Sequence, residues 1–376
     1  MRIDKNTTIR LGDRNIVKVK LGDVVIWQKT TEPEPVGPDY FYIESLGDAN
    51  TISVKNKGDG STDNVTPTLE YSKDKNTWNT ITFDWTSGEH TTELPVKLNT
   101  GEKMYFRNDT RKFSSSYNSN ISFLSSVSSN VGGDIRTLSN YLDVNSETTA
   151  QSNMFRNLFY NNEYIVDASN LRLPYTTLAS NCYISMFRGC TSLTAAPELP
   201  STTIAIGCYQ YMFYGCNSLT TAPALPATTL AGGCYGLMFS GCTSLTTAPE
   251  LPATTLANEC YYQMFNGCSS LTTAPALPAT TITEYCYSGM FNGCTSLTSA
   301  PALPATTLLY RCYSSMFSGC TSLNSITVYA NDISATDCID DWLYGVASSG
   351  TFRNLGSATY STGASGIPTG WTEVKN

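Results

Sequence analysis

The sequence repeats itself with a fixed period. The phrase Cys-Tyr-x-x-Met-Phe-x-Gly-Cys-x-Ser-Leu recurs every 26 residues and begins at Cys182, Cys208, Cys234, Cys260, Cys286 and Cys312. A period in this range is typical of stacked supersecondary units, because no single unit can bury its own apolar side and its neighbours must cover it. The repetition therefore predicts a solenoid over residues 182–330.

Each copy is expected to contain one short helix and one short strand. In the copy at residues 252–278, a threonine pair can cap a helix, and apolar residues follow at four-residue steps, namely Leu256, Cys260 and Met264. Gly267 is expected to end the helix, and residues 271–277 are expected to be extended. The strands of successive copies would then form a parallel sheet on one side of the solenoid.

The composition changes before the repeats, which indicates separate modules. Residues 1–29 form short apolar runs around two Leu-Gly-Asp turns and are predicted to be an N-terminal β anchor that packs on a partner or on copies of itself. The alternative is a hairpin that belongs to the next domain. Residues 30–38 are a proline-rich linker, and residues 39–130 contain short β-type runs separated by polar turns, which predicts an immunoglobulin-like β-sandwich.

Two irregular modules are expected at the ends of the solenoid, because terminal units must shield the core from water. Residues 131–181 are predicted to be the N-terminal cap, in which Met154-Phe155 corresponds to the later Met-Phe pairs. Residues 331–376 are predicted to be the C-terminal cap, in which Trp342 and Trp371 cover the last turn. The fold class predicted for the whole chain is multidomain α+β.

All 13 cysteines lie inside the repeats or at their end. An odd number leaves at least one thiol unpaired, and we expect buried, reduced thiols that stack on their equivalents in neighbouring copies. A row of disulfides and a set of metal ligands are the alternatives. Zinc sites usually draw on cysteine pairs two to four residues apart, whereas these cysteines are eight apart, and we expect no metal or cofactor.

The charge distribution argues against several classes of partner. The net charge of -8 disfavours nucleic acid, which is bound mainly by Lys and Arg. No run of about 18 apolar residues occurs, so no membrane insertion is expected. The first residues lack the features of a secretory signal, which predicts assembly in the cytoplasm of the producing cell. Between residues 182 and 329 charged side chains are so few that recognition would depend on hydrogen bonds, aromatic stacking and shape.

Candidate binding residues emerge when the copies are compared with one another. The core positions barely change, whereas the residues after Cys-Tyr and the residue after Met-Phe vary, and these variable positions are expected to face solvent. Their Tyr, Asn and Arg side chains suit the binding of glycans or proteins. The candidates are Arg188, Tyr211, Tyr214, Tyr262, Asn266 and Asn292. The alternative is neutral variation on a surface that binds nothing.

The sequence shows no catalytic set. It has a single histidine, no Ser-His-Asp combination and no glycine-rich phosphate loop beside a lysine. We therefore expect a protein that is not an enzyme.

Gly-Cys-Thr-Ser-Leu, which begins at Gly189, Gly241, Gly293 and Gly319, resembles the BspA-type leucine-rich repeat. Residues 69–78 and 101–107 resemble the sandwich module that precedes such repeats in Bacteroidales surface proteins, although Lys75 stands where a glycine is common. The ending Gly366–Trp371 is similar to the tail of the same proteins, and the Leu-Gly-Asp turns resemble leader segments of phage tail and fibre proteins.

These resemblances imply a structural adhesion protein. The first expectation is an appendage of a phage virion, assembled in the host cytoplasm, homo-oligomeric, held to other virion proteins by residues 1–29, and presenting the leucine-rich-repeat solenoid to host-surface or mucosal glycans or proteins. The second is an adhesin on a bacterial cell surface.

Overall fold

The computed structural model describes residues 39–58, 68–84, 86, 88–108, 120–142, 144 and 148–375, and the backbone alone of four strands between residues 9 and 28. The chain forms two compact units, Met1–Asp39 and Tyr40–Asn376. In the first unit, β1 (Ile9–Leu11) pairs antiparallel with β2 (Arg14–Ile16), and β3 (Lys18–Leu21) with β4 (Val24–Gln28). The short strands expected there are confirmed, and their anchoring role stays a prediction. The predicted linker at residues 30–38 lies outside the described residues.

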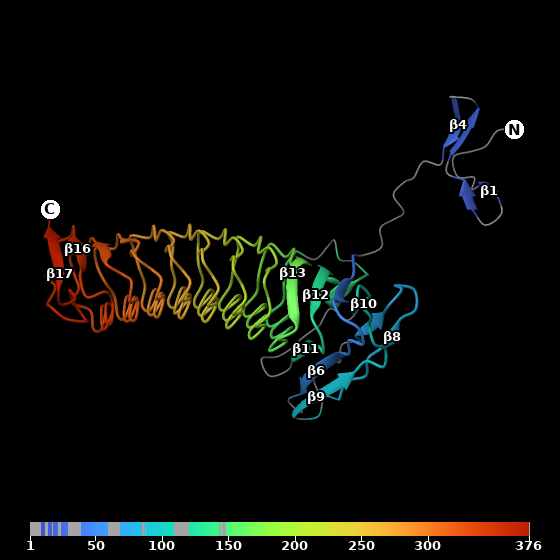
Figure 1. Ribbon diagram of the computed structural model, residues 1–376, viewed down its shortest axis with the longest axis horizontal. Coiled ribbons are helices and arrows are strands. Elements are labelled where there is room, and N and C mark those ends of the chain that lie inside the picture. The colour runs from blue at the N-terminus through green and yellow to red at the C-terminus, as the bar shows by residue number, and fades with distance from the viewer. Residues whose placement is uncertain are drawn as a thin grey trace. The chain divides into compact units, whose positions relative to one another are not determined.

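The second unit begins with two β-sheets (Figure 1). One has the strand order β13-β12-β5-β10-β7-β8, and the other has the order β11-β6-β9. Their bounds are β5 (Phe41–Ser45), β6 (Ile52–Gly58), β7 (Glu70–Ser72), β8 (Asn79–Thr80), β9 (Gly88–Glu93), β10 (Lys103–Arg107), β11 (Asn120–Ser125), β12 (Ser129–Asp134) and β13 (Ile165–Arg172).

Aromatic rings fill the core between strands of these two sheets. Residues alternate between buried and half-buried along β5 and β10, as expected for strands with one buried face. The ring of Phe41 lies 5.8 Å from that of Phe106 and 5.3 Å from that of Phe123, centroid to centroid. An immunoglobulin-like topology for this region stays a prediction.

The sheets continue directly into the repeats. Strand β12 pairs antiparallel with β5 on one side and parallel with β13 on the other, and β13 belongs to the first turn of the repeat stack. The buried apolar residues form one continuous cluster from Phe41 to Trp371. The sheet region and the repeats therefore share a single core.

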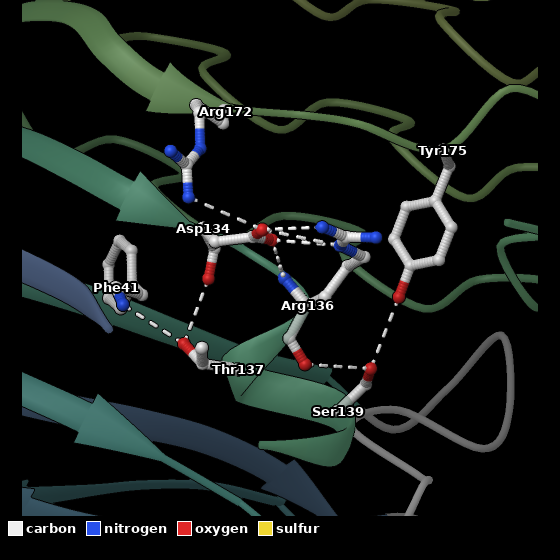
Figure 2. A network of polar contacts seen from close by, with 7 residues as sticks. All are labelled: Phe41, Asp134, Arg136, Thr137, Ser139, Arg172 and Tyr175. Carbon is white, nitrogen blue, oxygen red and sulfur yellow. Dashed lines mark hydrogen bonds and ion pairs between the residues drawn. The ribbon is translucent and has the colours of Figure 1, made fainter. Parts of the chain in front are cut away.

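A polar network lies at this junction (Figure 2). The carboxylate of Asp134, 4% exposed, accepts a 2.7 Å hydrogen bond from Arg136 and lies 3.5 Å from a guanidinium nitrogen of Arg172 on β13. The hydroxyl of Thr137 accepts a hydrogen bond from the backbone N–H of Phe41 and donates one to the carbonyl of Asp134. The buried carboxylate of Asp134 and the hydroxyl of Thr137 thus hold together β5, β13 and the turn after β12.

The repeats contain no helix, so the predicted α+β fold class is wrong. In the described part of the chain the one helix is α1 (Thr137–Asn140), which precedes the repeats. Where a helix was expected, each copy has a left-handed residue at every fourth position, for example Asn181 (φ 58°), Ser185 (φ 57°) and Gly189 (φ 75°). An α-helix requires negative φ throughout, so these residues convert the segment into consecutive four-residue turns.

Hydrogen bonds between copies take the place of helical ones. The N–H groups of Tyr183, Ser185 and Phe187 donate to carbonyls of the next copy over 2.9–3.0 Å. The N–H groups between them donate to the carbonyl three residues earlier, as Met186 does to Tyr183 over 3.2 Å. Every backbone donor of this segment is satisfied, half of them only because another copy is stacked beside it.

The expected parallel sheet is regular only towards the ends of the stack. In the middle copies, the described contacts between extended segments are single parallel bridges such as Thr221 to Thr247 and Thr247 to Thr273. Two prolines follow these threonines in each copy, as Pro223 and Pro226 follow Thr221, and a proline has no N–H to donate to a sheet. At the C-terminal end a parallel sheet forms from β14 (Ala302–Leu303), β15 (Ser325–Val328), β16 (Gly350–Asn354) and β17 (Trp371–Lys375). Its first strand, β14, still lies between Pro301 and Pro304, but β15 and β16 lie in a stretch without proline that extends to Pro368.

Identical side chains stack in columns inside the repeats. The ring of Phe265 lies 5.7 Å from those of Phe239 and Phe291, and the ring of Tyr261 lies 5.9 Å from Tyr235 and 5.7 Å from Tyr287. The 13 cysteines are buried and free, as expected. The turns that carry these side chains lie side by side from β13 towards β17 (Figure 1).

The first turn of the stack has a different alignment from the one predicted. Phe159, and not Phe155, stacks on Phe187 at 5.0 Å, while Phe155 stacks on Tyr183 at 5.9 Å. Leu158-Phe159 therefore occupies the Met-Phe position, and Met154-Phe155 occupies the Cys-Tyr position. The prediction was wrong because it matched residue identity, whereas the column is defined by burial of a ring.

At the other end, Trp342 is buried and stacks on Tyr313 at 6.5 Å and on Tyr360 at 5.9 Å. Its indole N–H donates to the carbonyl of Gly366 over 2.9 Å. Trp371 is 8% exposed, and its indole N–H donates to the carbonyl of Ala347 over 2.7 Å. Both tryptophans cover the last turns, as expected.

Candidate functional site

The variable positions of the repeats form two adjacent columns along the stacked turns. The six predicted residues are half-buried, not fully solvent-facing. Other variable positions are buried, including Ile184 (7% exposed), Ser185 (7%), Ser240 (5%) and Ser288 (8%). The expectation that variable positions face solvent is therefore wrong for these four. Adjacent copies are joined by backbone hydrogen bonds, which bring their side chains close together and cover some of the variable positions.

Three of the predicted residues lie together in consecutive turns. The guanidinium of Arg188 lies 5.2 Å from the ring centre of Tyr211 and 4.8 Å from that of Tyr214. The two tyrosine rings are in edge contact at 5.9 Å. Tyr160, from the turn before, lies 5.7 Å from the same guanidinium. We refer to Tyr160, Arg188, Tyr211 and Tyr214 as the tyrosine–arginine cluster.

The other three predicted residues do not join this cluster. The hydroxyl of Tyr262 accepts a 3.0 Å hydrogen bond from the side chain of Gln263 in its own turn. Asn266 and Asn292 lie in consecutive turns further along, and their backbone carbonyls accept hydrogen bonds from Gly241 and Gly267 over 2.7 Å. Nothing links these three side chains to a pocket that the structure describes.

A pocket of about 310 Å³ adjoins the tyrosine–arginine cluster. One wall is the outer face of the β11-β6-β9 sheet and consists of Lys55, Lys57, Glu89, Asn120 and Ser122. The other wall consists of the first two repeat turns and contains Arg156, Asn157, Tyr160, Ser185 and Arg188. We refer to this space as the cationic pocket, because four of its side chains carry positive charge and one carries negative charge.

Strand pairing and direct bonds between the walls fix the shape of the cationic pocket. On β6, Lys55 pairs with Ser122 of β11, and Lys57 pairs with Asn120 of β11 and Glu89 of β9. Strand β11 is bonded to the first turn: the N–H of Phe123 donates to the carbonyl of Leu158 over 2.7 Å, and the hydroxyl of Ser122 donates to that of Asn157 over 2.6 Å. The pocket is therefore preorganised by the fold.

The charges of the cationic pocket are only partly paired. Lys55 forms a 2.6 Å ion pair with Glu89, and this hydrogen bond lowers the pKa of the Glu89 carboxyl. In the part of the chain that the structure describes, no carboxylate lies within ion-pair distance of Arg188. Arg311, a second arginine on the repeats, differs because it forms a 2.8 Å ion pair with Asp337.

The described residues offer no metal site and no membrane-spanning helix. No group of three or more His, Cys, Asp or Glu side chains among them could hold a metal ion. None of the helices in the described ranges is long and apolar enough to cross a membrane.

Of the ten residues that line the cationic pocket, Arg188 alone was predicted as a site residue, and the other nine were missed. Five of these nine come from strands that precede the repeats in the sequence: Lys55, Lys57, Glu89, Asn120 and Ser122. Arg156 and Tyr160 could have been found by aligning Phe159 with Phe187, which places Tyr160 in the same column as Arg188 and Tyr214.

Comparison with known protein families gives one match. Residues 156–247 and 235–338 match the family model described as BspA type leucine rich repeat region, in six copies. No curated protein matches the chain, and no solved structure matches it.

Proposed function

Residues 156–338 of this chain are BspA-type leucine-rich repeats, and we propose that the chain is a non-enzymatic surface protein. We propose that it attaches to glycans through the tyrosine–arginine cluster. The family is typical of surface-associated or extracellular proteins, which supports attachment as the general role. The cluster is the observation that carries the specific proposal. Three tyrosines and one arginine converge there on a repeat face that otherwise bears few charges.

Aromatic rings suit sugars because a tyrosine presents an apolar face for C–H groups and a hydroxyl for hydrogen bonding. They also lose little side-chain entropy on binding. Tyr211 and Tyr214 are half-buried and in edge contact, so their orientation is set before a ligand arrives. A preorganised aromatic surface is expected to bind more tightly than the isolated Tyr262.

Retention of the full chain on a mucin-coated surface tests this proposal. Wild-type protein is expected to be retained, and replacement of Tyr211 and Tyr214 together by Ala is expected to weaken retention at least tenfold. Tyr262→Ala is the matched control, since it removes a half-buried repeat tyrosine outside the cluster, and it should be retained like wild type. Equal losses in both variants, or no retention of the wild type, would refute the proposal.

For the location, we propose a virion appendage that is homo-oligomeric and contacts other virion proteins through residues 1–29. The support is the resemblance of the two Leu-Gly-Asp turns to phage leader segments. Mass spectrometry of purified virions and of bacterial envelopes tests this directly. Peptides of this chain in virions are expected, and their occurrence in envelopes alone would favour the bacterial adhesin instead.

A further inference from the structure

We propose that the cationic pocket binds the negatively charged group of an acidic saccharide, a carboxylate or a sulfate, while the neighbouring tyrosines hold the sugar. This inference deepens the proposed attachment function and rests on it. It commits to one ligand class, a saccharide with one negative charge per residue.

The charge of the pocket is the first argument. The chain as a whole has a net charge of -8, yet Lys55, Lys57, Arg156 and Arg188 line one small space with Glu89 as its one carboxylate. Like charges gathered in a cleft repel one another and focus the local potential, so an anion that enters relieves this repulsion. Arg188 contributes most to this argument, because no described carboxylate neutralises it.

The kind of anion follows from the side chains present. A guanidinium can donate two parallel hydrogen bonds to a carboxylate or sulfate. The Glu89 carboxyl, whose pKa is lowered, sits in the same wall and can accept hydrogen bonds from sugar hydroxyls. A ligand with hydroxyl groups beside its negative charge can therefore bond both a guanidinium and Glu89, whereas an ionised polyphosphate has no hydrogen to donate to this carboxylate.

The remaining lining favours a sugar over a simple ion. Asn120, Asn157 and Ser185 supply amide and hydroxyl groups, and Tyr160 supplies a ring that belongs to both the pocket and the tyrosine–arginine cluster. The volume, about 310 Å³, lies at the lower end of ligand pockets, which are roughly 300–1,000 Å³. One terminal sugar residue could enter while the next lies on Tyr211 and Tyr214.

Calorimetric titration of the full chain with defined sugars tests the inference. The probes are N-acetylneuraminic acid and glucuronic acid for the carboxylate, galactose 6-sulfate for the sulfate, galactose as the neutral sugar, and inorganic sulfate and ATP as anions without the required shape. At least one acidic sugar is expected to bind ten times or more tightly than galactose, and the acidic sugar preferred identifies the charged group. Inorganic sulfate and ATP should bind more weakly than that sugar.

Matched variants then locate the site. Arg188→Gln is expected to weaken binding of the acidic sugar at least tenfold. Lys57→Gln, at an exposed position of β6, is also expected to weaken this binding. Arg311→Gln is the control, because it removes a repeat-face guanidinium that is paired with Asp337 and lies outside the pocket, and it should bind like wild type. Thermal melting of each variant checks that it is folded. If Arg188→Gln does not fold, the affinity of Lys57→Gln for the acidic sugar decides the test.

Three results would overturn the inference. They are equal affinity for galactose and the acidic sugars, equal affinity for inorganic sulfate and the acidic sugars, and unchanged affinity in both pocket variants. The attachment function would survive these results if mucin retention persisted after enzymatic removal of sialic acid and sulfate and still depended on Tyr211 and Tyr214. Failure of the two proposals can thus be told apart.

Discussion

Burial controls the chemistry of the cysteines. The thiols of Cys216, Cys242 and Cys268 each donate to a phenylalanine carbonyl of the preceding turn over 3.1–3.2 Å. Burial raises the pKa of Cys182 and of Cys260 to about 12, well above the ordinary value of 9.0. Since the thiolate is the nucleophile and the metal ligand, these thiols are packing groups that hold little reactivity in the folded protein.

This burial predicts that the protein loses stability in alkaline solution. Between about pH 9 and pH 12 the thiols of the native state stay protonated, whereas those of the unfolded state lose their protons. The free energy of unfolding therefore has its full value below pH 9 and falls as the pH rises above it. Each thiol ionised only in the unfolded state contributes a fall of about 1.4 kcal/mol per pH unit. Urea midpoints measured from pH 7 to pH 10.5 should therefore decline steeply above pH 9.

Cys260→Ala serves as the control for this prediction, because it removes one such group and should make the decline slightly shallower. The buried tyrosines act in the same direction but from a higher ordinary pKa of 10.0. A midpoint that did not change between pH 7 and pH 10.5 would contradict the prediction.

The four-residue step within each repeat fits both an α-helix and a row of tight turns, which explains why the helix was predicted wrongly. Leu256, Cys260 and Met264 have this spacing in either structure. A sequence signal for turns does exist in the first turn of the repeat stack, where asparagine occupies all three left-handed positions, Asn153, Asn157 and Asn161. Asparagine tolerates positive φ better than most residues, so three of them at this spacing favour turns over a helix.

Gly267 occupies one of the left-handed positions, where glycine is the residue without steric cost. Its φ is +74°, whereas an added Cβ would lie 3.8 Å from its nearest neighbour, in ordinary contact. Gly267→Ala should therefore destabilise the protein through backbone conformation alone, by about 1–2 kcal/mol. Urea unfolding at neutral pH measures this difference.

Gly232→Ala is the matched control for Gly267→Ala. Gly232 lies in the same stack with ordinary φ, and an added Cβ would approach nothing closer than 3.7 Å. This variant should be as stable as wild type or about 0.5 kcal/mol more stable, since alanine restricts the unfolded chain. Equal destabilisation by the two substitutions would show that left-handed geometry is not the cause.

The second unit, Tyr40–Asn376, is held together by a core that runs from the sheets into the repeats without interruption. Asp134 is central to the junction, because its buried carboxylate joins the turn after β12 to β13. Repeat stacks depend on contacts between neighbours, so damage at one interface is expected to weaken mainly the adjoining turns. The cationic pocket, which has one wall on each side of this junction, depends on the same contacts.

Asp134→Asn tests the importance of the junction. The change removes the charge that faces Arg136 and Arg172 in a site where the carboxylate is 4% exposed, and should cost about 2–3 kcal/mol. Hydrogen exchange should accelerate in β12 and β13 and remain unchanged in β15, at the far end of the stack.

Asp337→Asn is the comparison for Asp134→Asn. It removes the partner of Arg311, but both side chains are more than one third exposed, so the loss should be below about 1 kcal/mol. If the two substitutions had equal effects, or if Asp134→Asn accelerated exchange uniformly, the junction would not have the local role inferred here.

The order of residues along the chain was enough to establish the 26-residue period, the inner columns of Tyr, Phe and Cys, and the covering role of Trp342, because each depends on which side chains avoid water at a regular spacing. Three of the six predicted site residues, Arg188, Tyr211 and Tyr214, also proved to be neighbours, since equivalent positions in stacked copies must lie side by side. The cationic pocket needed the folded chain, and so did the turns in place of helices, apart from the asparagine signal in the first turn of the stack. Their hydrogen bonds and charges join residues about 25 to more than 100 positions apart, and no local spacing in the sequence records such contacts.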